Sequence, residues 1–157
     1  MATPIIELIS ENIKTAINEI TTANGYNQTL AGYRSKRIDF SDFRPENHKV
    51  LIVQADEDDA DQVVQDGVAK EWAQPYMLLA IVVDSDAATT SIDTRINQVR
   101  ADIQKKLMVD PTRGGYAIDT VLLPGEKIPE NDLGYSGIVV NIVVNYRVKI
   151  EDPYTQI

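Results

Sequence analysis

Two stretches of the chain repeat apolar residues at the spacing of an α-helix. The first contains an isoleucine at every third or fourth position. Its members are Ile6, Ile9, Ile13, Ile17 and Ile20. Thr3-Pro4 favours a helix start, with the hydroxyl as cap and proline at the first helical position. Asn24-Gly25 favours a left-handed end. We therefore predict a helix over residues 4–22 that lies on a sheet.

The second helical stripe precedes a proline. Its members are Ile92, Ile96, Val99, Ile103 and Leu107. Lys105 and Lys106 place positive charge where the dipole of a helix favours it, at the C-terminal end. Asp110-Pro111 then stops the pattern, and Arg113-Gly114-Gly115 indicates a turn. The residues between 84 and 90 are predicted to lead into this second helix.

Near the end of the chain, apolar residues recur at every second position, which is typical of a β-strand with one face in a core. Between Gly137 and Lys149 all even positions are apolar. They are Ile138, Val140, Ile142, Val144, Tyr146 and Val148. At ~3.3 Å per residue such a strand could reach roughly 40 Å, more than a domain of this size needs to fill its own sheet. A strand that outgrows its core predicts contact with another molecule.

Four more segments are predicted to be strands, namely residues 29–40, 48–55, 68–84 and 116–123. Pro75 falls inside the third and indicates a bulge or a break. The second half of that strand, Met77 to Val83, is apolar on both faces, which predicts a central position covered on both sides. Polar connections are predicted at residues 42–47, 56–61 and 124–135.

The order of helix, strands, helix and strands predicts an α+β fold, with a mixed, mainly antiparallel β-sheet flanked by two α-helices. With 157 residues we expect one domain, over residues 1–149. Residues 150–157 form a C-terminal tail that no pattern requires to be ordered. Hydrophobic residues make up 43% and charged residues 25% of the chain, as in ordinary globular proteins.

The chain contains no cysteine, which excludes a disulfide framework, a thiolate zinc site and a cysteine nucleophile. Its longest apolar run is too short to span a bilayer, and its first residues lack the pattern of a secretory signal. We expect a protein that is made in, and stays in, a cytoplasm-like environment.

Residues that could support catalysis are few. His48 is the only histidine, and without a nucleophile and an orienting carboxylate it is predicted to be a surface or strand-end residue. Asp56 to Asp61 could offer oxygens to a divalent cation, but Asp61 and Gly67 stand where the calcium loop needs glycine and glutamate. Gly114-Gly115 follows a helix, so it does not fit a phosphate loop. We expect no enzyme, no cofactor and no metal.

The net charge is −9, from 24 acidic and 15 basic residues. Such a surface repels nucleic acid unless its basic residues gather on one face. The densest basic cluster is Arg34, Lys36 and Arg37, which favours a solvated edge strand protected by charge.

In the order and spacing of its elements, nearly the whole chain resembles the tail terminator (tail completion) proteins of long-tailed bacteriophages. The resemblance begins with the isoleucine helix that stops at Asn24-Gly25-Tyr26 and the strand that ends in Val82-Val83-Asp84. It continues with the second helix, which contains Asp102-Ile103 and Leu107, and with Asp110 and the Gly114-Gly115 turn. It ends with the strand that closes at Tyr146-Arg147. It implies a mixed or antiparallel sheet flanked by two helices. It also implies a ring, usually of six subunits, that caps the tail tube, stops its growth and docks the head-side connector. The family has no cofactor and no catalytic residues to transfer.

From this resemblance we expect a homo-oligomer at the tail–neck junction of the virion, with the tail tube protein and the connector as partners, no membrane, and DNA passing through without specific binding. The candidate oligomer-interface residues are Arg34, Lys36, Tyr146 and Arg147. We call Asp56, Glu57, Asp58, Asp59 and Asp61 the acidic segment; it departs from the family pattern. We expect it to line the hole or its rim, where negative charge would let DNA slide.

Two alternatives stay open. The first is another head–tail joining or neck protein, which has a comparable size and role. The second is a small-ligand-binding or divalent-metal-binding α+β module, which predicts a monomer with a formed polar pocket.

Overall fold

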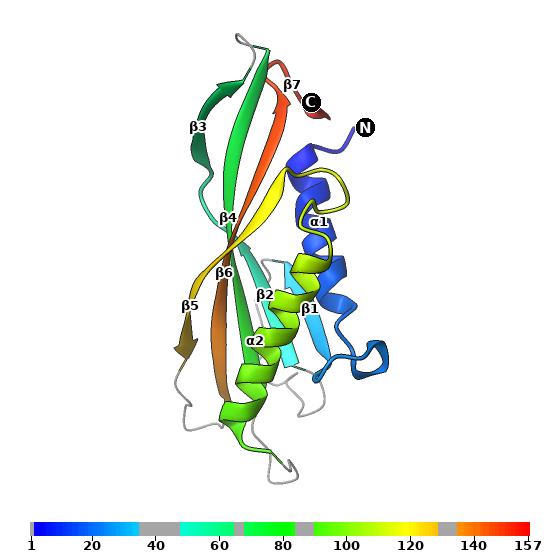
Figure 1. The fold of residues 1–157 in the computed structure, drawn as a ribbon, viewed down its shortest axis with the longest axis vertical. Coiled ribbons are helices and arrows are strands. Elements are labelled where there is room, and N and C mark those ends of the chain that lie inside the picture. The colour runs from blue at the N-terminus through cyan, green and yellow to red at the C-terminus, as the bar shows by residue number, and fades with distance from the viewer. Residues whose placement is uncertain (1, 35–47, 65–67, 84–89, 129–134) are drawn as a thin grey trace.

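The computed structural model describes residues 2–34, 48–64, 68–83, 90–128 and 135–157, apart from the side chains of residues 59–64, 83 and 135. In this part of the chain two helices cover one face of a seven-stranded sheet (Figure 1). The predictions for residues 35–47, including the turn at 42–47, lie outside the described residues. So does most of the predicted lead-in to the second helix.

The first helix, α1, spans Ile5–Asn18 and is shorter than predicted. Pro4, not Thr3, is the residue before the helix, and no side chain caps it. The Pro4 carbonyl accepts hydrogen bonds from the amides of Glu7 and Leu8 at 3.0 and 3.2 Å. A short 3₁₀ helix, η1 at Thr22–Asn24, follows, and Gly25 ends it with φ of 87°. Gly25 is therefore left-handed as predicted, because glycine adopts a positive φ without strain. It ends η1 and not α1, however, since α1 stops at Asn18 and its C-cap residue Glu19 has a right-handed φ of −83°.

The second helix, α2, spans Ile92–Val109 and agrees with the prediction. Ser91 caps it, since its hydroxyl accepts a hydrogen bond from the Thr94 amide at 3.2 Å. After the helix, Arg113 also has a positive φ of 51°, followed by Gly114 at 74° and Gly115 at 87°. The predicted turn at residues 113–115 is confirmed.

The strands are β1 (Leu30–Arg34), β2 (His48–Gln54), β3 (Asp58–Val64), β4 (Ala69–Val83), β5 (Asp119–Ile128), β6 (Tyr135–Lys149) and β7 (Asp152–Gln156). Their order is β1-β2-β4-β6-β5, with β3 also paired to β4 and β7 also paired to β6. Only the β1–β2 pair is parallel among these pairs, and the others are antiparallel. The predicted α+β fold, with a mixed and mainly antiparallel sheet, is confirmed.

Three segments predicted to be irregular are strands instead. Residues 58–61 of the acidic segment belong to β3, residues 124–128 belong to β5, and residues 152–156 of the C-terminal tail form β7. In each case pairing to a long neighbouring strand overrides weak local preference, because β-propensity depends strongly on context. The polar sequence of β5 is accommodated by a register shift between Leu123 and Glu126, next to Pro124.

The centre of the sheet is the antiparallel pair of β4 and β6. All 15 residues of β4 are paired with β6 in one continuous register, from Ala69 opposite Lys149 to Val83 opposite Tyr135. Pro75 causes neither a break nor a bulge in this pairing. Its carbonyl accepts a hydrogen bond from the Ala55 amide at 3.0 Å, where β2 ends and β3 has not yet begun. The N–H and C=O groups of one strand residue point to the same side. The side on which Pro75 lacks an N–H is therefore the side of this junction and not that of β6, so its pairing with β6 loses no hydrogen bond.

The core lies between the helices and one face of the sheet. Even-numbered residues of β4 and β6 point toward α1 and α2, and Leu78, Val140, Ile142 and Val144 are almost fully buried. Burying such side chains contributes roughly 1.5–3 kcal/mol each. The prediction that Met77 to Val83 is covered on both sides is wrong at Met77, which is 44% exposed on the other face, whereas Ile81 on that same face is 8% exposed.

Candidate functional site

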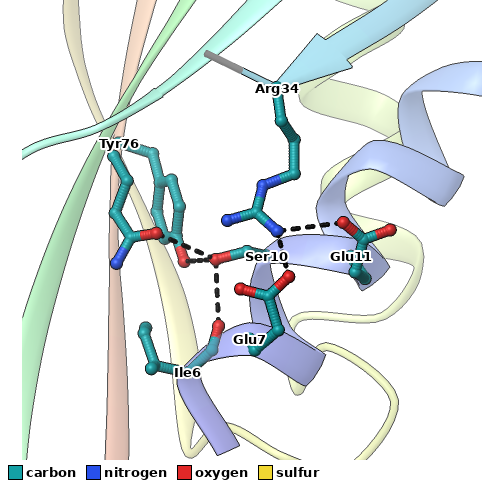
Figure 2. A network of polar contacts seen from close by, with 7 residues as sticks. Ile6, Glu7, Ser10, Glu11, Arg34 and Tyr76 are labelled. Carbon is teal, nitrogen blue, oxygen red and sulfur yellow. Dashed lines mark hydrogen bonds and ion pairs between the residues drawn. The ribbon is translucent and has the colours of Figure 1, made fainter. Parts of the chain in front are cut away.

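Arg34, the last residue of β1, lies over α1. Its guanidinium donates hydrogen bonds to the carboxylates of Glu7 and, at 2.9 Å, Glu11 (Figure 2). The hydrogen bond to Glu7 is the largest of the effects that raise the pKa of Arg34. The charge of Arg34 is thus paired within the chain through one of its two terminal nitrogens, Nη1, so Arg34 stabilises the contact between β1 and α1. Lys36, predicted beside it, lies outside the described residues.

A second polar contact joins α1 to the central strand. The Ser10 hydroxyl donates to the Ile6 carbonyl at 2.9 Å and lies 2.6 Å from the hydroxyl of Tyr76 in β4 (Figure 2). Burial raises the pKa of Tyr76 to about 12, so its phenol is neutral at ordinary pH. Neither hydroxyl has a base beside it in this contact, and the arrangement serves to position α1 on the sheet.

A cavity of about 380 Å³ opens beside these two contacts. Its lining includes Glu11, Lys14, Arg34, Gln54 and Tyr76. The two basic and one acidic residue in this lining, with an amide and a neutral phenol, could hold a small polar ligand. Among the described residues no group of three or more acidic or histidine side chains is placed to hold a metal ion.

The structure brings together Tyr146, one of the predicted oligomer-interface residues, and Glu57, one residue of the acidic segment. Tyr146 in β6 is 4% exposed, and its hydroxyl donates to the carboxylate of Glu57. Burial is the main cause that raises the pKa of Tyr146, and the Glu57 carboxylate adds to it. The side chain of Tyr146 is therefore part of the core of the single chain. It leaves little surface for a partner.

The acidic segment leads into an edge strand. Asp56, Glu57 and Asp58 have exposed side chains. The backbones of Asp59 and Asp61 belong to β3, and their side chains lie outside the described part. These three exposed residues form a negative stretch at the β2–β3 junction, in which the Glu57 carboxylate is hydrogen-bonded to Tyr146.

The face of the sheet opposite the helices carries a broad apolar surface. The register places Leu51, Leu79 and Val139 side by side across β2, β4 and β6. The next row contains Val53, Met77, Asn141 and Leu123, and a further row contains Pro75, Val143 and Val121. We call Leu51, Val53, Met77, Leu79, Val121, Leu123, Val139 and Val143 the open-face patch. Met77, Val121 and Leu123 are 44%, 41% and 39% exposed.

Polar residues border the open-face patch at one end. Arg147 lies opposite Glu71 in the register, and its guanidinium donates to the Glu71 carboxylate at 3.1 Å. Asn145, whose amide donates to Asp119 at 2.7 Å, lies between this pair and the patch. An apolar centre with a polar border is the usual anatomy of a protein–protein interface. Of the predicted interface residues that the structure describes, namely Arg34, Tyr146 and Arg147, only Arg147 lies on this face.

Sequence reasoning missed the open-face patch, although a signal for it was present. Val139 and Val143 in β6 and Val121 and Leu123 in β5 all occupy the positions that alternate with the core positions. Three neighbouring strands with apolar residues on both faces indicate either a second covering layer or an exposed surface. The position of the two helices relative to the sheet decides between these possibilities.

Sequence reasoning also missed the buried basic residues, among them His48 and Arg113. His48 lies at a strand end, as predicted, but is only 1% exposed. Its Nε2 lies 3.0 Å from the Gln28 side-chain oxygen, and burial, with the nearby charge of Arg95, lowers the pKa of His48 to about 4. Arg113 is 1% exposed and donates to the carbonyls of Leu107 and Asp110 at the end of α2. It satisfies helix carbonyls that would otherwise be unpaired.

No protein-family model matches the chain, and a search of curated proteins finds no match either. Neither α1 nor α2 in the described part is both long and apolar enough to cross a membrane.

Proposed function

We propose that this chain is a structural virion protein that forms a ring on the end of a phage tail tube. The ring would terminate tube growth and offer a docking surface to the head-side connector. The proposal combines the resemblance in element order with the shape of the sheet. It assigns the chain no catalytic step.

One observation supports an assembly role most strongly. The chain has a broad apolar sheet face with no covering layer among the described residues, in which Met77, Val121 and Leu123 are each about two-fifths exposed. Contiguous exposed apolar surface of this kind usually marks an interaction site. In addition, the end of the β4–β6 pair that carries β3 and β7 extends beyond the helices (Figure 1).

The acidic segment has a place in this proposal. The exposed carboxylates of Asp56, Glu57 and Asp58 would line the hole of the ring or its rim. A negatively charged wall does not hold phosphates by counterion release, so DNA could slide past it. A structure of the ring with these residues on its outer circumference would refute this part while leaving the assembly role intact.

Light scattering at several protein concentrations, with and without purified tail tubes, tests the proposal. We expect the chain to bind tubes as a ring and to block further addition of tube subunits. A chain that stays monomeric and ignores both tubes and connectors would contradict the proposal. A missing free ring would not, because weak oligomers form only when a partner shifts the equilibrium.

A neck protein is the alternative within the same class. It would bind the head-side connector first and would not arrest tube growth. A tube-elongation assay with and without the chain separates the two functions, because only a terminator stops elongation.

The cavity beside Arg34 and Tyr76 favours a second candidate function, the binding of a small polar ligand. This function predicts that ligand addition raises the melting temperature of a monomer. A screen of small polar metabolites, repeated on Gln54→Leu, would identify it. Stabilisation that is lost in this variant would favour ligand binding.

A further inference from the structure

This inference rests on the proposed function and concerns how neighbouring copies meet. A ring that binds a tube on one end and a connector on the other has two different ends. Its symmetry must therefore be cyclic, because two-fold axes across the ring would make its ends equal. Cyclic rings with more than two members use heterologous contacts, in which two different surfaces of the chain meet. Each copy must then carry two separate, complementary surfaces.

The open face of the sheet is large enough to be one of them, with the open-face patch as its apolar centre. Five strands of 5 to 15 residues, at ~4.8 Å spacing and ~3.3 Å rise per residue, give the whole open face an area of roughly 800 Å², of which the open-face patch covers roughly 300 Å². One partner of a stable complex buries roughly 800 Å². The outer side of α2 is not a good match, since exposed polar residues such as Asp93, Asn97 and Arg100 occupy it.

A second apolar surface lies on the helix side of the molecule. Val109 ends α2 and is 69% exposed, and Ile118, 45% exposed, stands on the other side of the same turn. This turn is compact, because the Ala117 amide donates to the Thr112 carbonyl at 2.9 Å. The C-terminus joins it, since the Gln156 side chain donates to the Gly115 carbonyl at 2.6 Å and places the 40% exposed Ile157 nearby. We call Val109, Ile118 and Ile157 the turn patch.

The two patches lie on opposite sides of the sheet. Val109 belongs to the helix layer. Ile118 lies two positions before Thr120 and therefore points to the same face of the sheet, and Thr120 is buried on the helix side. The open-face patch belongs to the alternate positions of the same strands. We infer that the turn patch of one copy docks on the open-face patch of the next copy, and that repetition of this contact closes the ring.

This arrangement differs from a sheet-on-sheet dimer. Two open faces packed together would form an isologous contact that uses the same patch twice and ends at two copies. Such a dimer would not need the turn patch at all. The two arrangements therefore predict different behaviour for variants in the turn patch.

Two single substitutions test the contact. Met77→Glu places a charge in the open-face patch, and Val109→Glu places one in the turn patch. Both positions are exposed in the single chain, so we expect each variant to fold. Ala101→Glu, on the exposed side of α2, is the charge-matched control, and Met77→Leu keeps the open face apolar. Circular dichroism and thermal melting check the fold of all four.

Sedimentation velocity is then measured where the wild-type chain associates, in solution or on tail tubes. We expect each Glu variant alone to stay monomeric, and an equal mixture of the two to form dimers and nothing larger. In each mixed dimer the intact turn patch of Met77→Glu would bind the intact open-face patch of Val109→Glu. The two patches that remain unbound would be the substituted ones, so no third copy could bind. Both controls should assemble like the wild type.

Three results would overturn the inference. One is a Val109→Glu variant that assembles normally, which would leave the turn patch without a role. Another is a mixture that stays monomeric. The third is a wild-type chain that associates under neither condition.

Cross-linking gives an independent readout that does not depend on charged substitutions. The chain has no cysteine, so introduced thiols react without background. A Leu123→Cys, Ile118→Cys double variant treated with a short bismaleimide should yield a ladder of multimers, and each single variant should yield none. A dimer from Leu123→Cys alone would indicate the isologous contact and overturn the proposal.

Failure of the function and failure of the contact can be told apart. If the mixture forms dimers and the ladder appears, but tubes keep growing, the contact stands and the terminator function falls. If tubes are capped, but Val109→Glu caps them as well as the wild type, the function stands and this contact falls.

Discussion

At the scale of single residues, His48 is the group that makes stability depend on pH near neutrality. It is buried, and its pKa is lowered to about 4 from an ordinary value of 6.5. At a pH between these two pKa values, His48 is protonated in the unfolded chain and neutral in the folded chain. Stability is therefore complete above about pH 6.5, and it is lost progressively as the pH falls toward 4.

We predict that the free energy of unfolding falls by about 2 kcal/mol between pH 7 and pH 5 because of His48 alone. Urea denaturation at several pH values measures this. His48 is the only histidine, so His48→Gln should give a much flatter profile over the same range. Equal slopes for the two proteins would show that His48 is not buried in its neutral form.

The hydroxyl contact between Ser10 and Tyr76 provides a second prediction at this scale. Tyr76 is 1% exposed, and its oxygen lies 2.6 Å from that of Ser10. Tyr76→Phe should cost about 1–2 kcal/mol, because it removes one partner of a buried hydrogen bond. In a double-mutant cycle with Ser10→Ala, the coupling energy should be about 1 kcal/mol. Additive effects would mean that the two hydroxyls act independently.

At the scale of elements, the start of α2 depends on a single side chain. The Ser91 hydroxyl accepts from the Thr94 amide at 3.2 Å and also lies 2.9 Å from the Thr94 hydroxyl. We predict that Ser91→Ala lowers the free energy of unfolding by about 1 kcal/mol, whereas Ser91→Asp keeps most of the stability. Thermal denaturation of both variants checks this, with Thr90→Ala as the neighbouring control. A loss of similar size in Thr90→Ala would contradict the capping role.

Periodicity predicted the elements that bury a complete face. The two stripes of apolar residues predicted α1 and α2, the period-two pattern predicted β6, and continuous apolar runs predicted β2 and β4. These patterns failed for β3 and β7, since Asp58, Asp59 and Asp61 have low strand preference and Pro153 interrupts the other segment. These short strands form because β4 and β6 continue past the core and offer unpaired backbone groups. Local sequence does not contain that information.

The candidate site was predicted only in part. The expectation of a strand longer than its core led to an assembly role, but the residues chosen for the interface came from charge and chain position. Arg34 pairs with α1 and Tyr146 is buried, which follows from long-range contacts with Glu7 and Glu57. Whether the open-face patch is covered depends on where both helices lie. A single sequence does not specify that.

At the scale of the whole molecule, charge opposes the association of copies. Each chain has a net charge of −9. Contacts between apolar patches must then overcome repulsion that salt screens over about 10 Å at 0.1 M. We predict that self-association strengthens as sodium chloride rises from 0.05 to 0.5 M, because this tenfold change shortens the screening length roughly threefold. Sedimentation equilibrium over this range measures it, and weakening with salt would indicate contacts made by ion pairs.

The continuous β4–β6 pair also has a mechanical consequence. In an antiparallel pair the hydrogen bonds run perpendicular to the strands. A pull along the strand axis therefore loads the bonds of all 15 paired positions together, whereas a pull across the strands breaks them one after another. Single-molecule stretching with handles at Ala69 and Tyr135, which lie at opposite ends of the pair, should give a high rupture force in shear. Handles at Ala69 and Lys149, which lie at the same end, should give a low force in peeling. A joint that carries tension along this pair would stay rigid under load.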